Sequence, residues 1–260
     1  MNKYRVYGSK PYNVVIVHGG PGAPGEVAPV CRKLSEFFGV IEPFQSKHTI
    51  DEQLGELYEI LTNNVQIPAI LVGYSWGAWL TYIFTSKYPE LVKKLVLLSS
   101  GPFEHSYVEQ MNNTRQKRLA PDDRLLLDNL INELNSGNCV EKKEIFGQFG
   151  KIMSKTDLFS PMQSSNEILE FQPEIFDSIM GEAIKLRING TLLNCGKNIT
   201  CPVISIHGDY DPHPYDGVYA PLKKILPDFK FILLEKCGHT PWIEKYAYED
   251  FFKVLIKEIT

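Results

Sequence analysis

The sequence predicts an α/β fold, with a mostly parallel sheet, helices on both faces and a helical lid insertion. Segments with the pattern of buried strands alternate with segments of helical periodicity in the first hundred residues, and the alternation returns near the C-terminus. Several strand segments are continuous apolar runs, which are typical of parallel strands covered on both faces. Between the two parts only helical patterns remain. We therefore interpret the two parts as one sheet that a helical insertion interrupts.

The N-terminal part contains several strand and helix patterns in series. Thr49 is the candidate N-cap of one helix, and Tyr88-Pro89 ends another. The elements expected, in chain order, are an edge strand at 4–8, a buried strand at 13–19, a helix at 26–38, a strand at 39–45, a helix at 49–64, a strand at 68–74, a helix at 75–87 and a strand at 94–100. Strand-helix units in series favour parallel pairing, because each crossover returns the chain to the same edge.

The helical insertion is predicted over residues 104–200, and the core over residues 1–103 and 201–260. We expect the insertion to sit over the sheet as a lid. Residues 173–190 have a helical pattern. So do residues 122–137, which end at the stop signal Gly137 and have an apolar face of Leu126, Leu130, Ile131 and Leu134. The elements expected after the insertion are a strand at 202–209, a helix at 218–225, a strand at 229–239 and a final helix at 240–259.

The charge balance excludes some classes of partner. The chain has 27 basic and 31 acidic residues and a formal net charge of −4, so it offers no field that attracts nucleic acid or anionic lipid. It shows no signal-peptide pattern and no apolar run of the roughly 18 residues that a membrane span needs. Its five cysteines are scattered and give no disulfide framework. We expect a cytoplasmic protein whose partner is a small-molecule or short-peptide substrate; the oligomeric state is not predicted.

The motif GYSWG, residues 73–77, carries the first candidate for catalysis. It follows a buried strand and opens a helix, which is the context that the G-x-S-x-G signature requires. Glycines on both sides of the serine let neighbouring elements pass close and leave its hydroxyl exposed. The helix N-terminus offers free N–H groups to developing negative charge. We therefore predict that Ser75 is a nucleophile rather than a simple helix cap.

A serine hydroxyl needs a base at neutral pH, and histidine has a suitable pKa. Of six histidines, His239 lies in the loop between the last strand and the last helix, so in a parallel sheet it shares an edge with Ser75. The base needs a carboxylate that fixes its tautomer. Asp209 and Asp211 both satisfy the chain order serine, aspartate, histidine. We prefer Asp211 because it lies beyond the strand end, whereas Asp209 suits a turn or cap.

The stretch VVIVHGGPGAPGE, residues 14–26, has more glycine and proline than a strand and a turn require. Backbone N–H groups that face a substrate carbonyl must not be obstructed by side chains, and glycine meets that condition. The stretch is therefore a candidate oxyanion loop. His18 is interpreted as a residue that shapes this loop rather than as the base.

The chain resembles the α/β-hydrolase superfamily through HGGPG, GYSWG, HGDYD and CGHTPW, in that order and over nearly its whole length. HGGPG together with SWG is most similar to the proline iminopeptidase branch. The resemblance implies an α/β-hydrolase fold with oxyanion-hole N–H groups from Gly20 and Trp76. Tyr74 departs from the branch, which usually has a second glycine there. In that branch, acidic lid residues bind the free amine of the substrate, and the candidates here are Glu167, Glu170, Glu174 and Glu182.

These observations predict a serine hydrolase that cleaves a small ester, amide or amino-terminal peptide substrate. Ser75 attacks the carbonyl, His239 takes the proton, Asp211 orients His239, and the N–H groups of Gly20 and Trp76 hold the oxyanion. Water then completes the hydrolysis. No metal and no organic cofactor is implied, and the substrate-binding residues are not predicted.

Three alternatives stay open. One is a metal hydrolase, which would place zinc or manganese on side chains that alternate with a period of two: His207, Asp209, Asp211 and His213. Pro212 and Pro214 argue against such a strand, and this alternative leaves the GYSWG motif at residues 73–77 without a role. Another is a non-catalytic protein of the same fold that binds a small ligand. The third is a lyase or C–C hydrolase that uses the same triad.

Overall fold

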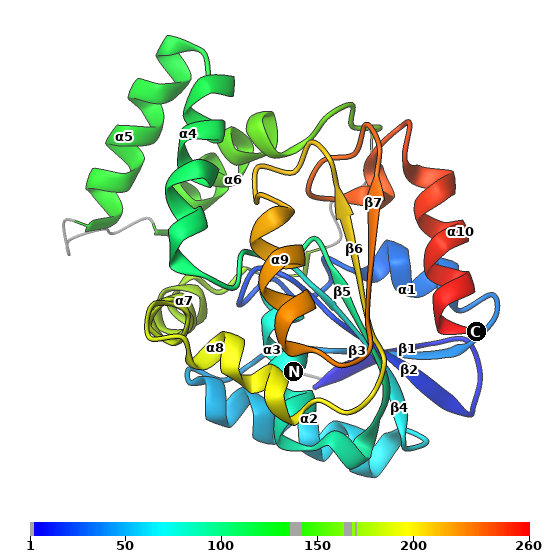
Figure 1. Ribbon diagram of the computed structural model, residues 1–260. Helices are drawn as coiled ribbons and strands as arrows, with labels where there is room; N and C mark the ends of the chain where they lie inside the picture. The colour runs from blue at the N-terminus through cyan, green and yellow to red at the C-terminus, as the bar shows by residue number, and fades with distance from the viewer. Residues whose placement is uncertain (1–2, 136–141, 164–167, 170) are drawn as a thin grey trace.

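The structure, a computed structural model, describes residues 3–135, 142–163, 168–169 and 171–260 (Figure 1). Seven strands form one sheet in the spatial order β1-β3-β2-β4-β5-β6-β7. The strands are β1 (Tyr4–Tyr7), β2 (Tyr12–Val17), β3 (Gly39–Pro43), β4 (Ala69–Tyr74), β5 (Val92–Leu98), β6 (Val203–Gly208) and β7 (Phe229–Leu234). Neighbouring strands from β3 to β7 are parallel, and β1 pairs with β3 in the antiparallel direction. The predicted mostly parallel sheet is confirmed.

The central strands are apolar along their length because both faces of the sheet are covered. One row of paired residues crosses four strands, and each member is at most 1% exposed: Val15, Leu71, Leu95 and Val203. Since these strands run in one direction, their carboxyl ends share one edge of the sheet. The loops that follow β2, β4, β6 and β7 therefore meet there, as expected of a binding site in an α/β sheet.

Helices cover both faces of the sheet, as predicted, and each face has its own apolar cluster. One face carries α2 (Ile50–Asn64), α3 (Trp76–Lys87) and α9 (Asp216–Ile225); the other carries α1 (Ala28–Leu34) and α10 (Tyr248–Ile259). Thr49 caps α2, since its Oγ1 accepts the backbone N–H of Glu52 at 3.3 Å. Among the described residues, no helix combines the length and the apolar character that crossing a membrane requires.

Further helices separate β5 from β6 along the chain, although these two strands are neighbours in the sheet. They are α4 (Val108–Arg118), α5 (Pro121–Asn135), α6 (Lys142–Asp157), α7 (Pro173–Ile188) and α8 (Thr191–Asn194). The group α4, α5 and α6, green at the upper left of Figure 1, packs around a small apolar cluster of its own. In contrast, α7 contributes Ile175 and Ile179 to the main core. The limits of the insertion at residues 104 and 200 stay a prediction.

The predicted apolar face of α5 was partly wrong. Leu126 and Ile131 are 40% and 39% exposed, whereas Leu127 and Leu130 are buried. Three consecutive leucines fit more than one helical face, and packing against α6 selects the face that contains Leu127. The predicted stop at Gly137 lies outside the described residues.

The predicted start of the final helix was also wrong, because α10 begins at Tyr248 rather than at Thr240. Pro241–Ile243 forms a 3-10 turn instead. The next residue, Glu244, is completely buried, and its carboxylate accepts the backbone N–H groups of Gly238, Phe159 and Ser160. These bonds hold the segment in an irregular conformation that hydrophobic periodicity alone does not reveal.

Candidate active site

Ser75 occupies the turn between β4 and α3 in a backbone conformation that few non-glycine residues adopt. Its φ is 52° and its ψ is −115°. Such a conformation costs about 1–3 kcal/mol and persists only where the surroundings impose it. Here the backbone N–H of Ser75 donates to the carbonyl of Leu98, the last residue of β5, at 2.9 Å. The neighbouring strand therefore fixes the turn that carries the hydroxyl.

The glycines on either side of Ser75 are required by close packing. A Cβ on Gly73 would collide with the carbonyl oxygen of Gly77 and the hydroxyl of Thr81. A Cβ on Gly77 would collide with the carbonyl oxygens of Val17 and His18. The first turn of α3 can therefore lie directly against the end of β2 only because residue 77 has no side chain.

The structure brings together Ser75, His239 and Asp211, which follow β4, β7 and β6 respectively. The Ser75 hydroxyl lies 3.1 Å from Nε2 of His239, and Nδ1 of His239 lies 2.7 Å from Oδ2 of Asp211. With a proton on Nδ1, the imidazole donates to Asp211 and its Nε2 accepts from the hydroxyl. In this arrangement a histidine can take the serine proton while a carboxylate fixes its tautomer.

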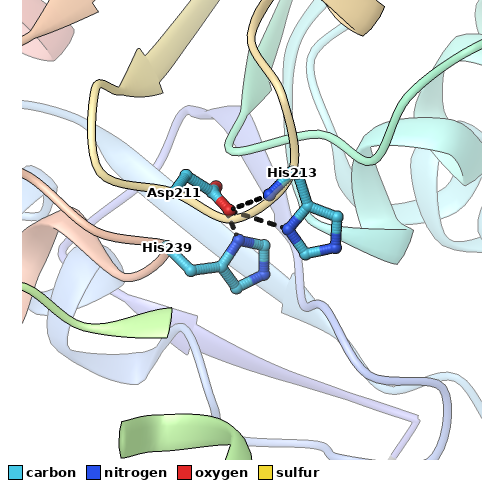
Figure 2. Close-up of side chains that lie close together, drawn as sticks. All are labelled: Asp211, His213 and His239. Atoms are coloured by element: carbon cyan, nitrogen blue, oxygen red, sulfur yellow. Dashed lines mark hydrogen bonds and ion pairs between the residues drawn. The ribbon is translucent and has the colours of Figure 1, made fainter. Parts of the chain in front are cut away.

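Asp211 is also bound by a second histidine, His213 (Figure 2). Its Oδ1 accepts the backbone N–H of His213 at 2.9 Å and the ring Nδ1–H at 2.7 Å. The rings of His213 and His239 lie against each other, with centroids 4.5 Å apart. His207 donates from Nε2 to the carbonyl of His213 at 2.9 Å, and the same atom is 3.5 Å from Oδ2 of Asp211. Both oxygens of the buried carboxylate are thus held in place.

Asp209 does not belong to this group. Its Oδ1 accepts the backbone N–H of Cys237 at 3.1 Å, which joins the ends of β6 and β7. The four side chains of the metal-hydrolase alternative therefore do not converge as a set. Among the residues that the structure describes, Asp211, His213 and His239 have potential ligand atoms within 4.8 Å of one another. Both imidazole Nδ1 atoms are directed at Asp211, as hydrogen-bond donors to a carboxylate.

Burial and charge give the histidines different protonation behaviour. Burial alone would lower the pKa of His239, but the charge and hydrogen bond of Asp211, together with Asp157, raise that pKa above its ordinary value. Burial lowers the pKa of His213 to about 4 and also lowers that of His207, so both rings are neutral at pH 7. Although burial opposes it, the three imidazoles hold the pKa of Asp211 well below its usual range. His239 is therefore paired with an ionised carboxylate.

Gly20 and Trp76 lie at the same edge of the sheet. Gly20 lines the cavity that His239 also lines. Trp76 is the first residue of α3, so its backbone N–H has no acceptor within the helix. Gly22 explains part of the glycine surplus in another way: its φ is 78°, and a Cβ there would come within 2.5 Å of the carbonyl oxygen of Gln172. The glycine loop therefore has to fit closely against the inserted segment.

Tyr74, where the sequence departs from the iminopeptidase pattern, supports the histidine loop. Its ring centroid lies 5.2 Å from that of His239 and 4.6 Å from that of Trp242. Its hydroxyl is 2.9 Å from the hydroxyl of Thr240. A glycine at this position would remove these contacts. Tyr74 stands directly before the motif serine, and this position could have identified it as a residue of the site. Sequence reasoning noted the departure from the family pattern but gave Tyr74 no role.

A cavity of about 1060 Å³ adjoins the histidine and extends between the core and the insertion. Its apolar lining includes Phe146, Phe171 and Trp242, and the carboxylates among its described lining residues are Glu26 and Asp157. The two predicted amine-binding glutamates that the structure describes do not line this cavity: Glu182 accepts the backbone N–H of Ile50 at 2.8 Å, and Glu174 is exposed. Glu167 and Glu170 lie outside the described residues. Sequence reasoning missed both carboxylates: Asp157 belongs to no motif, and Glu26 ends the glycine-rich stretch at 14–26 but was given no role of its own.

The two carboxylates differ in whether a cationic side chain neutralises their charge. Arg115 binds Asp157 with two hydrogen bonds, of 2.9 and 2.6 Å, and keeps the pKa of Asp157 below its ordinary value although burial opposes this. Glu26 accepts the backbone N–H of Gly19 at 2.9 Å, and among the described side chains none forms an ion pair with it. Burial raises the pKa of Glu26 to about 7. Of the two, only Asp157 has a cationic partner within the part of the chain that the structure describes.

Comparisons with known proteins place the chain in a family. The model of the alpha/beta hydrolase fold family matches residues 43–246. A protein of Bacillus subtilis (strain 168), provisionally named 2-succinyl-6-hydroxy-2,4-cyclohexadiene-1-carboxylate synthase, is 27% identical over 208 residues, which are 76% of this chain and 69% of that protein.

Solved structures agree with the family match. The proline iminopeptidase of Mycobacterium smegmatis is 17% identical with a TM-score of 0.65, and the alignment covers 98% of this chain and 93% of that one. The meta-cleavage product hydrolase of Pseudomonas fluorescens IP01 is 17% identical with a TM-score of 0.64, over 98% of this chain and 92% of that one. At these identities, the likeness shows the fold. From the family match over most of its length, we conclude that the chain belongs to the alpha/beta hydrolase family and is a hydrolytic enzyme.

Proposed function

We propose that this enzyme hydrolyses a small ester, amide or amino-terminal peptide substrate through an acyl-enzyme on Ser75. The observation that carries the proposal is the continuous hydrogen-bond chain from the Ser75 hydroxyl through His239 to Asp211. A serine paired only with a helix N-terminus would be a cap. A serine that is also paired with a buried histidine-carboxylate pair has a base for its proton.

The proposed reaction has two steps. His239 takes the Ser75 proton as Oγ attacks the substrate carbonyl, and the N–H groups of Gly20 and Trp76 bind the oxyanion that forms. The tetrahedral intermediate collapses, and the protonated His239 gives its proton to the leaving alcohol or amine. A water molecule, activated by the same histidine, then attacks the acyl group on Ser75 and releases the acid and the free serine.

Labelling with a fluorophosphonate tests the nucleophile. We expect the probe to modify Ser75 in the wild type, and we expect Ser75→Ala to lose both labelling and ester hydrolysis, with a fall in kcat of several orders of magnitude. Ser154→Ala is the matched control, because Ser154 lines the cavity beside His239 and its hydroxyl donates to the carbonyl of Lys151 rather than to a histidine. Undiminished ester hydrolysis by Ser75→Ala would contradict the mechanism. Wild-type protein without turnover or labelling would favour a ligand-binding role.

Within this proposal, Glu26 favours substrates that carry an amine. Its carboxylate lines the cavity beside His239 and has no cationic partner among the described side chains. An ammonium group in the substrate would supply that partner. One of the structural relatives is a proline iminopeptidase, whose name is consistent with an amine-bearing substrate. A screen of aminoacyl naphthylamides against acyl esters separates the peptidase branch from the esterase branch.

A second candidate keeps the triad and changes the bond that breaks. It is a lyase step or the cleavage of a C–C bond, and it is supported by the names of two relatives, a synthase and a meta-cleavage product hydrolase. Product analysis distinguishes it from ester hydrolysis. An enzyme that breaks a C–C bond in a meta-cleavage product, and leaves short p-nitrophenyl esters nearly untouched, would favour this candidate.

A further inference from the structure

Gln45 joins the two segments that are proposed to form the oxyanion hole. It lies just after β3 and is only 3% exposed. Its Nε2 donates to the backbone carbonyl of His18 at 2.9 Å, and its Oε1 accepts the indole N–H of Trp76 at 2.7 Å. His18 precedes Gly20 by two residues, and Trp76 follows Ser75 directly. One buried side chain therefore connects the glycine loop to the start of α3.

The two partners of Gln45 demand opposite polarity. A backbone carbonyl can only accept a hydrogen bond, and an indole N–H can only donate one. The bridging side chain must therefore present a donor and an acceptor a fixed distance apart, which a primary amide does. A glutamate would place an acceptor against the His18 carbonyl, and a methionine would satisfy neither partner. Because both partners are buried, each lost bond leaves a polar group unpaired.

Two further contacts hold His18 in place. The backbone N–H of Gln45 donates to Nε2 of His18 at 3.4 Å, a long bond. Burial lowers the pKa of His18 to about 4, so the ring is neutral at pH 7 and its Nε2 is free to accept. On the other side, the His18 carbonyl packs directly against Gly77 in α3. The position of the glycine loop relative to α3 is thus set by one steric contact and one amide bridge.

We propose that Gln45 is a positioning residue of the oxyanion hole, which couples the N–H of Gly20 to the N–H of Trp76. The inference rests on the proposed function. An oxyanion needs both donors at about 2.7–3.1 Å, and a misplacement of about 1 Å costs on the order of 100-fold in rate. Gln45 does not touch the substrate in this account. It fixes the separation between two segments that come from distant parts of the chain.

The test is Gln45→Met, which keeps the length of the side chain and removes both bonds. With a short p-nitrophenyl ester, we expect kcat to fall about 10- to 100-fold with KM nearly unchanged, because the oxyanion forms only after binding. A boronic acid inhibitor, which mimics the tetrahedral state on serine, should bind more weakly by a similar factor. Trp76→Phe removes only the indole donor and should lower kcat by part of that amount. Combining both changes should cost no more than Gln45→Met alone.

Gln53→Met is the matched control. Gln53 is 1% exposed, lies in α2, and donates from Nε2 to the carbonyl of Lys47 at 2.9 Å. We expect it to lower the melting temperature without changing kcat by more than about threefold, since it lies outside the site. If Gln45→Met keeps the wild-type kcat and inhibitor affinity, the inference is wrong. If Gln45→Met does not fold, Trp76→Phe decides, and wild-type kcat in that variant also overturns the inference. Wild-type enzyme that neither labels at Ser75 nor hydrolyses esters would instead refute the proposed function.

Discussion

The backbone N–H of His239 donates a 2.7 Å hydrogen bond to the carbonyl of Asp157. Asp157 is the last residue of α6, so the loop that carries the proposed base rests on the insertion. A Cβ on Gly238 would collide with the same carbonyl, which shows how closely the two segments approach. The position of the insertion and the position of the histidine are therefore linked. A change at the end of α6 can therefore move His239 through this backbone hydrogen bond.

Glu244→Gln tests this link. The Glu244 carboxylate accepts three backbone N–H groups, two from the inserted segment and one from Gly238, and an amide oxygen cannot replace both carboxylate oxygens. We expect the free energy of unfolding, measured with urea, to fall by about 1–3 kcal/mol, because a buried donor loses its acceptor. We also expect a fall in kcat. Glu235→Gln, an exposed change before the same loop, should alter neither quantity.

Asp211→Asn should change both the rate and its pH dependence. Burial lowers the pKa of His239 and the Asp211 charge raises it, so removal of the charge lowers it. The acid limb of kcat/KM, where the base becomes protonated, should therefore move to lower pH. The rate on the plateau should fall by about 10⁴-fold because the tautomer is no longer fixed. In the control Asp209→Asn, the limb should stay in place. A limb that does not move in Asp211→Asn would show that another group controls it.

His213→Phe should move the acid limb of the kcat/KM pH profile in the opposite direction, to higher pH. The ring Nδ1–H of His213 binds Oδ1 of Asp211, and this bond disperses the carboxylate charge that His239 experiences. Without it, Asp211 should stabilise the protonated His239 more strongly, so the acid limb should shift to higher pH. The phenyl ring keeps the ring-to-ring contact with His239. A shift to lower pH would contradict this assignment of the hydrogen bond.

Glu26→Gln tests substrate charge. For alanyl naphthylamide we expect kcat/KM to fall about 10-fold or more, because a charge-assisted pair contributes about 1.5–3 kcal/mol. For propionyl naphthylamide, which lacks the amine, the value should stay within about threefold, since glutamine can still accept the Gly19 N–H. Glu36→Gln, an exposed change just beyond α1, is the control. An equal loss for both substrates would mean that Glu26 supports the loop rather than the amine.

The fold could be predicted because its signals are local. Continuous apolar strands, the alternation with helices and the cap at Thr49 are all readable from neighbouring residues. Ser75 and the glycines on either side of it could be predicted for the same reason, since the steric demands of a sharp turn produce a short sequence motif. The preference for Asp211 over Asp209 depended on the position of the strand end. The structure places Asp211 beside His239 and gives Asp209 a backbone bond to Cys237.

The remaining site features depend on contacts between distant segments. Gln45 and Glu26 lie far from Ser75 in sequence; Gln45 belongs to no motif, and Glu26 ends the glycine-rich stretch without being one of its glycines. Their contacts become visible only when β2, β3 and β4 are placed side by side. The face of α5 was missed because its partner helix, and not its own periodicity, decides between adjacent leucines. The start of α10 was missed because a buried carboxylate organises the turn before it.

The separation of β5 and β6 along the chain has a consequence for how the enzyme is made. Ser75 and His239 are 164 positions apart, and β6 can pair with β5 only after the inserted segment has been synthesised. Until then, the inner edge of β5 is an unpaired strand, which is prone to aggregation. Long-range pairing of this kind slows folding more than it reduces stability. A nascent chain that ends before His239 therefore has the proposed nucleophile but not the proposed base, and activity should emerge only when β7 and the loop after it have folded.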